Sequence, residues 1–153
     1  MNEIFVICIS IVLGLLATPG CDDSAKDDPG PDPESFSFRR GKQDGPLYIY
    51  PADGRFDFLN EKRGNHVDGV LSADVIAKLR ALTTPELQRV YRDNCAADNE
   101  SCVAQGGYRL SSRYFDRACC YIPSRVTEPR TKEMLDYLIP LFEKYQLESE
   151  MKP

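Results

Sequence analysis

Four cysteines in the second half of the chain are the residues best suited to chemistry. They are Cys95, Cys102, Cys119 and Cys120. Four thiolates can hold a structural zinc ion, but zinc ligands usually pair at a spacing of about two to four residues. Six residues separate Cys95 from Cys102, and Cys119 is directly followed by Cys120. This spacing favours disulfides, and we expect neither a metal ion nor a cofactor.

The adjacent pair also limits how these cysteines can bond. Successive residues of a strand point to opposite faces, so Cys119 and Cys120 are not expected to bond with each other. Each is expected to bond with one of the two upstream cysteines, Cys95 and Cys102. Which pairs with which stays open from the sequence. Each bridge would stabilise the domain by on the order of 3 kcal/mol in the chain-entropy model.

The only histidine, His66, is the residue on which Ser–His–Asp or Cys–His catalysis would depend. The surrounding residues 60–69 are polar and rich in turn formers, which predicts a loop. No serine lies in a Gly-x-Ser-x-Gly motif, and no spacing of carboxylates singles out an acid–base pair. We therefore expect no catalytic residues, and a protein that is not an enzyme.

The elements that position these residues are predicted by periodicity and by helix start signals. They are expected in the order hairpin, two helices, hairpin and carboxyl-terminal helix, over residues 47–59, 72–82, 85–91, 108–122 and 129–147. Strand pairs followed by helices predict an α+β fold, a small antiparallel sheet covered by helices and stabilised by disulfides. The predicted core consists of Tyr48, Phe56, Phe58, Ile76, Leu79, Val90, Leu110, Leu138 and Phe142.

The amino terminus has the composition of an export signal. Ile4 to Ala17 is an apolar run of fourteen residues, followed by small residues at 18–20. As a helix it would measure ~21 Å, which is shorter than the ~30 Å core of a bilayer. This length is typical of a signal peptide, so we expect residues 1–20 to be one and the protein to be exported.

The residue after this signal is Cys21. Gly20-Cys21 after an apolar run resembles the lipobox of bacterial lipoproteins, in which the cysteine is acylated and becomes the new amino terminus. The resemblance covers only residues 1–21, and it implies lipid (palmitate) at Cys21 and attachment to a membrane of the cell envelope, on its periplasmic or outer face. Exported cysteines tend to pair, and lipidation of Cys21 leaves an even number for disulfides. Ordinary signal cleavage is the alternative.

A segment rich in aspartate and proline follows Cys21. Residues 21–35 carry six acidic side chains and three prolines, and they contain no large hydrophobic residue that could order them. We expect residues 21–45 to be a disordered acidic tether and residues 46–148 to be one globular domain, since 153 residues allow a single domain of ordinary size. The net charge of −5 argues against a nucleic-acid partner.

Together these features predict a lipid-anchored, non-enzymatic domain of the bacterial cell envelope with a binding, inhibitory or scaffolding role. Its partners would be the membrane, through the lipid, and an unidentified protein or envelope component. One alternative is a secreted eukaryotic peptide-factor precursor, because Arg39-Arg40 and Lys62-Arg63 resemble dibasic processing sites and Asn99-Glu100-Ser101 is a glycosylation sequon. A small exported hydrolase that uses carboxylates is a third hypothesis.

Overall fold

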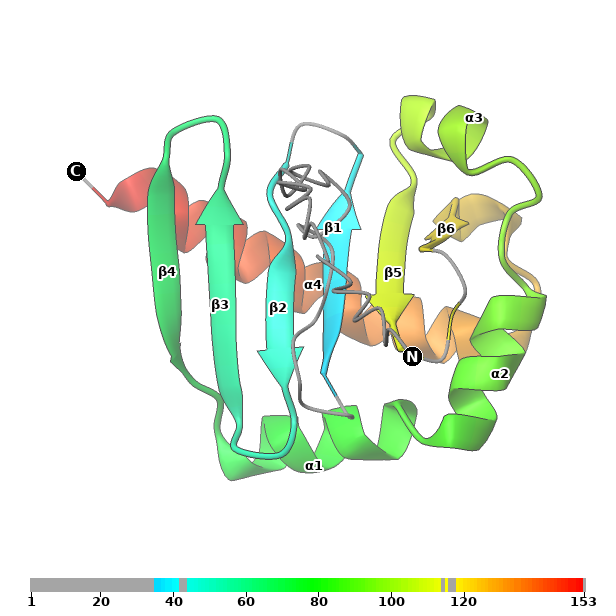
Figure 1. The fold of residues 1–153 in the computed structure, drawn as a ribbon, viewed down its shortest axis with the longest axis horizontal. Helices are drawn as coiled ribbons and strands as arrows, with labels where there is room; N and C mark the ends of the chain where they lie inside the picture. The colour runs from blue at the N-terminus through cyan, green and yellow to red at the C-terminus, as the bar shows by residue number, and fades with distance from the viewer. Residues whose placement is uncertain (1–34, 42–43, 114, 116–117, 153) are drawn as a thin grey trace, which may run out of the picture.

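The structure is a computed structural model that describes residues 35–41, 44–113, 115 and 118–152. The predicted signal peptide, Cys21 and the acidic residues as far as Glu34 lie outside the described residues. Across the described ranges, one six-stranded antiparallel sheet and four α-helices form the fold (Figure 1). The predicted α+β class, with a small antiparallel sheet, a carboxyl-terminal helix and a disulfide, is confirmed.

The sheet has the strand order β4-β3-β2-β1-β5-β6. Its strands are β1 (Phe36–Arg40), β2 (Leu47–Tyr50), β3 (Arg55–Asn60), β4 (Asn65–Val70), β5 (Tyr108–Ser112) and β6 (Cys119–Tyr121). The helices are α1 (Ala73–Leu82), α2 (Pro85–Asp93), α3 (Asn99–Ala104), the 3-10 turn η2 (Pro123–Arg125) and α4 (Pro129–Met151). The first four strands form a meander, and β5 returns to pair with the free side of β1, so β1 lies inside the sheet.

The position of β1 corrects the predicted domain boundary. The tether was expected to extend to residue 45, but β1 lies within that stretch and pairs on both sides. Phe36 and Phe38 are 1% and 0% exposed, so this strand is part of the core. β1 was not predicted because its alternating pattern contains only two apolar residues before Arg39, which is too short to indicate a strand. The folded domain therefore includes residues 36–40, which the predicted boundary at residue 46 left out.

The predicted loop and a stretch for which no element was predicted also contain regular structure. The stretch 60–69 forms a turn and then the edge strand β4, in which Val67 is the large apolar side chain that faces the core. The polar stretch 96–107 contains α3, whose first turn is capped by the Asp98 carboxylate. Both elements have few buried apolar residues, which explains why hydrophobic periodicity did not reveal them.

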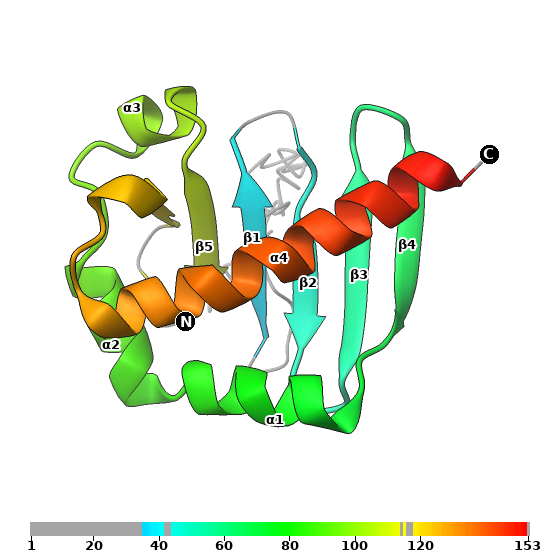
Figure 2. The same cartoon turned by 180° about the vertical axis from the view of Figure 1, so that it is seen from behind.

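One face of the sheet is covered by α4, which crosses it diagonally (Figure 2). At the centre of this layer the Phe142 ring stands edge-on to the rings of Phe38, Phe58 and Tyr108, with centroids 5.4 to 6.4 Å apart. α1 runs along the ends of the strands, and α2 lies beside the β5–β6 side of the sheet (Figures 1 and 2). No helix of the described segments is both long enough and apolar enough to cross a membrane.

Most of the predicted core is buried. Phe56, Phe58, Leu79, Leu110, Leu138 and Phe142 are buried, whereas Tyr48, Ile76 and Val90 are half-buried. Tyr48 was assigned to the wrong face of the sheet, because in β2 it is Leu47 and Ile49 that point toward α4. The helix α4 continues four residues beyond its predicted end and passes through Pro140, which lies on its exposed side.

The start of α4 is fixed by the carboxylate of Glu128. Its oxygens accept hydrogen bonds from the backbone N–H groups of Arg130 and Thr131 (3.0 and 2.5 Å) and from the Thr131 hydroxyl (2.7 Å). Burial alone would raise the pKa of the Glu128 carboxyl, but these hydrogen bonds outweigh it and hold that pKa below its ordinary value. The negative charge also complements the positive end of the helix dipole.

The packing of α4 predicts a large effect of substituting Phe142. Phe142→Ala removes a 0% exposed ring from the contact with three aromatic neighbours. We expect it to lower the free energy of unfolding by about 3–5 kcal/mol, measured by urea unfolding. The control on the same helix is Leu147→Ala, since Leu147 is 58% exposed. The control should change stability by less than about 0.5 kcal/mol. Equal effects of the two variants would contradict the placement of α4.

The cap at Glu128 predicts a pH-dependent loss of stability. Because its pKa is depressed in the folded state, its contribution is present above the pKa of the unfolded carboxyl and is lost as pH falls through the folded pKa. Glu128→Ala should therefore cost about 1 kcal/mol at neutral pH, and its deficit relative to wild type should shrink in acid. Thermal melts across a pH series measure this. Glu61→Ala, in the exposed turn before β4, is the control, and an unchanged deficit at low pH would refute the role of the cap.

Candidate functional site

The face of the sheet opposite α4 carries polar and aromatic side chains, and we call it the outer face. Strand alternation places these side chains together, because residues directly opposite each other in a sheet lie on the same face. Ser37, Tyr48, Asp57 and Asp68 form one such row across β1 to β4. The full set comprises Ser37, Arg39, Tyr48, Tyr50, Arg55, Asp57, His66, Asp68, Arg109 and Ser111. Among the described elements, no helix lies over β1 to β4 on this side (Figures 1 and 2).

The part of the outer face over β1 and β5 is basic. Arg39 of β1 lies directly opposite Arg109 of β5, and both side chains are half-buried. Side chains in such a pair have Cβ atoms about 4.5–5.5 Å apart, so like charges there repel each other. Ser37 and Ser111 pair with each other next to the arginines, and of these two serines Ser111 is half-buried whereas Ser37 is only 2% exposed. This zone therefore brings two guanidinium groups to one place on the outer face.

The middle of the outer face is aromatic. Tyr48 and Tyr50 both lie on β2 and are half-buried. The guanidinium of Arg55 lies 5.1 Å from the centre of the Tyr50 ring and forms an ion pair with Asp53 at 2.5 Å. Burial and the nearby charge of Asp57 raise the pKa of the Tyr50 phenol, so this tyrosine stays neutral at physiological pH. Half-buried tyrosines of this kind supply contact area and a hydrogen bond with little loss of side-chain entropy.

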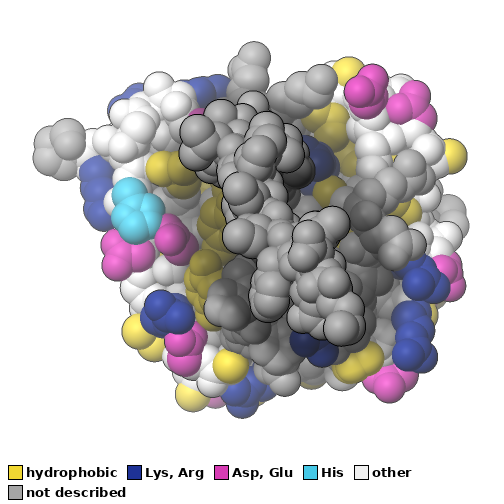
Figure 3. Space-filling view, viewed as in Figure 1, with side chains coloured by type: hydrophobic (Ala, Val, Ile, Leu, Met, Phe, Trp, Pro, Cys, Tyr) yellow, Lys and Arg dark blue, Asp and Glu magenta, His cyan; other side chains and the backbone are white. Residues whose placement is uncertain are grey.

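The part of the outer face over β3 and β4 is acidic and contains the only histidine. His66 lies on β4 rather than in a loop, and its Nε2 contacts Oδ1 of Asp57 while its Nδ1 lies 3.7 Å from Oδ1 of Asp68. Figure 3 shows the histidine at this side of the molecule with acidic side chains next to it. Both ring nitrogens thus face carboxylates, whereas a Ser–His–Asp arrangement needs a serine hydroxyl at one of them. His66 is placed to hold two acidic side chains on the surface.

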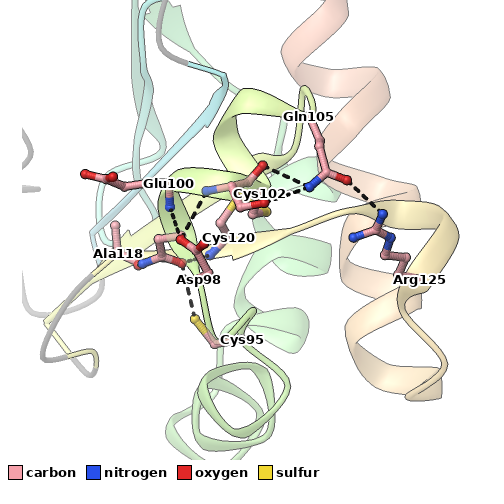
Figure 4. Close-up of a disulfide and its surroundings, with 10 residues drawn as sticks. Cys95, Asp98, Glu100, Cys102, Gln105, Ala118, Cys120 and Arg125 are labelled. Carbon is pink, nitrogen blue, oxygen red and sulfur yellow. Dashed lines mark hydrogen bonds between the residues drawn. A yellow bond between two sulfur atoms is a disulfide. The ribbon is translucent and has the colours of Figure 1, made fainter.

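The cysteines lie at the other end of the sheet. Cys102 of α3 and Cys120 of β6 form a disulfide with an S–S distance of 2.08 Å (Figure 4). As predicted, the two adjacent cysteines point to opposite sides, since Cys119 belongs to the main core and Cys120 to a small cluster under α3. The structure contains this one of the two predicted bridges, and Cys95 and Cys119 carry thiol groups. In the parts of the chain that the structure describes, no group of three or more metal-ligating side chains is arranged around a common point.

Two pockets border α3. The first, of about 330 Å³, lies beside the disulfide, and Arg125 donates to Gln105 (2.7 Å) at its rim, which in turn donates to Ser101 (2.9 Å). The second, of about 380 Å³, contains Asp44, which forms ion pairs with Arg40 (2.9 Å) and Lys62 (3.1 Å). The outer face, where the strand register places Arg39 opposite Arg109 next to Tyr48 and Tyr50, is the candidate binding surface.

Sequence reasoning found the cysteines and His66 but did not find the basic zone. The sequence feature that could have revealed the basic zone is the short alternation Phe36-Ser37-Phe38-Arg39, which places an arginine on the polar face of a strand. Arg109 lies within a predicted strand. However, β1 was not predicted, so nothing indicated that a second arginine lies opposite Arg109. Comparisons with known proteins add nothing to this picture, because no family model, no curated protein and no solved structure matches the chain.

Proposed function

We propose that the protein is an exported module of the bacterial cell envelope, anchored by lipid at Cys21, which binds an acidic segment of a partner protein through its outer face. The observation that carries the binding role is the direct register of Arg39 with Arg109 beside two tyrosines. Arginine binds carboxylates through charge-assisted, often bidentate hydrogen bonds, and arginine and tyrosine are enriched at protein interfaces. The role is non-enzymatic.

The proposed lipid anchor is supported by the number of residues between Cys21 and the first strand. Gly20-Cys21 after the apolar run has the form of a lipid attachment site, and β1 begins at Phe36. The fourteen residues between Cys21 and Phe36 can extend to at most about 50 Å. This length would hold the folded domain close to the membrane surface while leaving it room to turn toward a partner.

The peptide-factor hypothesis has its main processing site, Lys62-Arg63, in the exposed turn between β3 and β4, but its other motifs fit the structure less well. Arg39-Arg40 belongs to β1, which is paired on both sides, so a processing protease would reach it only after local unfolding. The Asn99 amide nitrogen, to which a glycan would attach, donates to the Ala118 carbonyl, and the amide oxygen accepts from the Cys120 N–H. A glycan at Asn99 would break contacts that hold β6.

Replacing Cys21 tests the anchor. In a bacterial host the wild-type protein is expected in the membrane fraction, with a mature chain that begins at Cys21 and carries lipid mass. Cys21→Ser should release the protein into the soluble fraction or leave the signal uncut, because acyl chains provide the attachment. Cys8→Ser, within the signal itself, is the matched control and should remain membrane-bound. Wild-type protein that is soluble, unlipidated and begins at Cys21 would contradict the proposal.

Neutralising the basic zone tests the binding surface. The probe is a fluorescent glutamate-rich peptide added to the chain that starts at residue 22, with a lysine-rich peptide as the opposite-charge comparison. Arg109→Gln should weaken binding of the acidic peptide by roughly tenfold, the value of one charge-assisted contact. Arg92→Gln on the exposed surface of α2 should leave binding nearly unchanged. Added salt should weaken wild-type binding. Equal binding to wild type and to the Arg39→Gln/Arg109→Gln double variant, with both folded by circular dichroism, would refute the assignment.

A further inference from the structure

The segment after α2 and the edge strand β6 bring two thiols into the same region of the core. Cys95 follows the end of α2 by two residues, and Cys119 is the first residue of β6. Cys119 is 2% exposed and is part of the main hydrophobic cluster, against which the half-buried Cys95 also packs. A backbone hydrogen bond from Ala96 N–H to the Cys120 carbonyl (3.0 Å) fixes the two segments next to each other.

The side chain of Asn99 links the surroundings of the two cysteines. Its Oδ1 lies 3.9 Å from Sγ of Cys95 and accepts a hydrogen bond from the N–H of Cys120 at 3.1 Å (Figure 4). Its amide nitrogen donates to the carbonyl of Ala118. One side chain therefore contacts Cys95 on one side and both chain neighbours of Cys119 on the other.

Tyr121 of β6 is hydrogen-bonded to the end of α2. Its hydroxyl donates to the carbonyl of Tyr91 at 2.8 Å, at the end of α2 from which Cys95 follows. Burial and the proximity of the Cys119 and Cys95 thiols raise the pKa of the Tyr121 phenol. Cys119 and Tyr121 are two residues apart on β6 and point to the same side. Cys95 packs against the main cluster to which Cys119 and Tyr121 belong, whereas Cys120 belongs to the other cluster and is already bonded to Cys102.

We propose that Cys95 and Cys119 form a second disulfide in the mature protein, which fixes the connectivity as Cys95–Cys119 and Cys102–Cys120. In the reaction each thiol gives up its proton, and an S–S bond forms between the two Sγ atoms. The two electrons reduce an external disulfide, such as that of a thiol-oxidising protein or of oxidised glutathione, whose own S–S bond breaks and whose two sulfurs take up the protons. In the cell this step rests on the proposed export, because disulfides persist in oxidising compartments.

The two bridges would hold β6 from both faces. This strand has three residues and pairs only with β5 among the described strands. Cys120 ties one face of it to α3, and Cys119 would tie the other face to the end of α2. The second disulfide is therefore a device that keeps a short edge strand in the sheet.

Thiol counting after oxidation in a glutathione redox buffer tests the proposal without any dependence on export. The chain that starts at residue 22 contains four cysteines. After denaturation and alkylation without reduction, the wild-type chain is expected to take up no label. Uptake of two labels, with the Cys102–Cys120 bridge intact, would overturn the second disulfide.

Paired variants establish the connectivity of the two bridges. Cys102→Ser/Cys120→Ser should still form one disulfide, as should the matched variant Cys95→Ser/Cys119→Ser. In contrast, Cys95→Ser/Cys120→Ser should remain reduced, since Cys102 and Cys119 face different sides of β6. The proposal would be refuted if Cys102→Ser/Cys120→Ser kept two reduced thiols while Cys95→Ser/Cys119→Ser formed a disulfide. Loss of the Cys95–Cys119 bridge alone should lower Tm by roughly 10 °C.

Thiol counting on protein isolated from cells tests the Cys95–Cys119 disulfide and the proposed export separately. If the pair oxidises in the buffer and carries thiols in the cell, the geometry stands and the proposed export is contradicted. If the pair stays reduced in the buffer, the proposed disulfide is refuted, whatever the location of the protein.

Discussion

The contact between the Phe142 ring and three aromatic rings of the sheet is the interaction on which the remaining architecture depends. Phe38, Phe58 and Tyr108 come from strands β1, β3 and β5, which lie far apart in the chain. One helical side chain therefore fixes the relative positions of three strands. The Phe56 ring, stacked on Tyr145 at 4.0 Å, extends the same contact by one turn of α4. With these rings buried, every second residue of each strand must point to the other side.

The outer face is a direct consequence of that burial. In β1 the residues Phe36 and Phe38 enter the core, and the alternation leaves Ser37 and Arg39 on the opposite side. In β5 the burial of Tyr108 and Leu110 does the same for Arg109. The register of β1 with β5 then sets the two arginines opposite each other. A slip of one residue would turn the arginines into the core, so stability and charge placement are fixed by the same register.

The sequence predicted those parts of the fold that carry long apolar patterns or strong start signals. The carboxyl-terminal helix that contains Leu138 and Phe142 and the two helices predicted over residues 72–82 and 85–91 all lie as expected. β1, β4 and α3 were missed, because each presents at most a few apolar side chains and gains its stability from neighbours distant in the chain. The candidate site was missed for the same reason. Arg39 and Arg109 are separated by seventy residues, and nothing in the local sequence of either indicates that they meet.

The two edge strands of the sheet determine whether copies of this domain can pair with each other through their strands. An exposed strand edge is a template on which a second copy can add its own strand, and confinement to a membrane raises local concentration. At β4 the ammonium of Lys152 donates to the backbone carbonyl of His66 (2.7 Å), and Asn65 donates to the carbonyl of Ser149 (3.1 Å). At the opposite edge β6 is only three residues long and is bonded to α3 through Cys120. The last turn of α4 thus blocks part of the β4 edge, and the β6 edge is short, so among the described strands a second copy would find only part of β4 as a template.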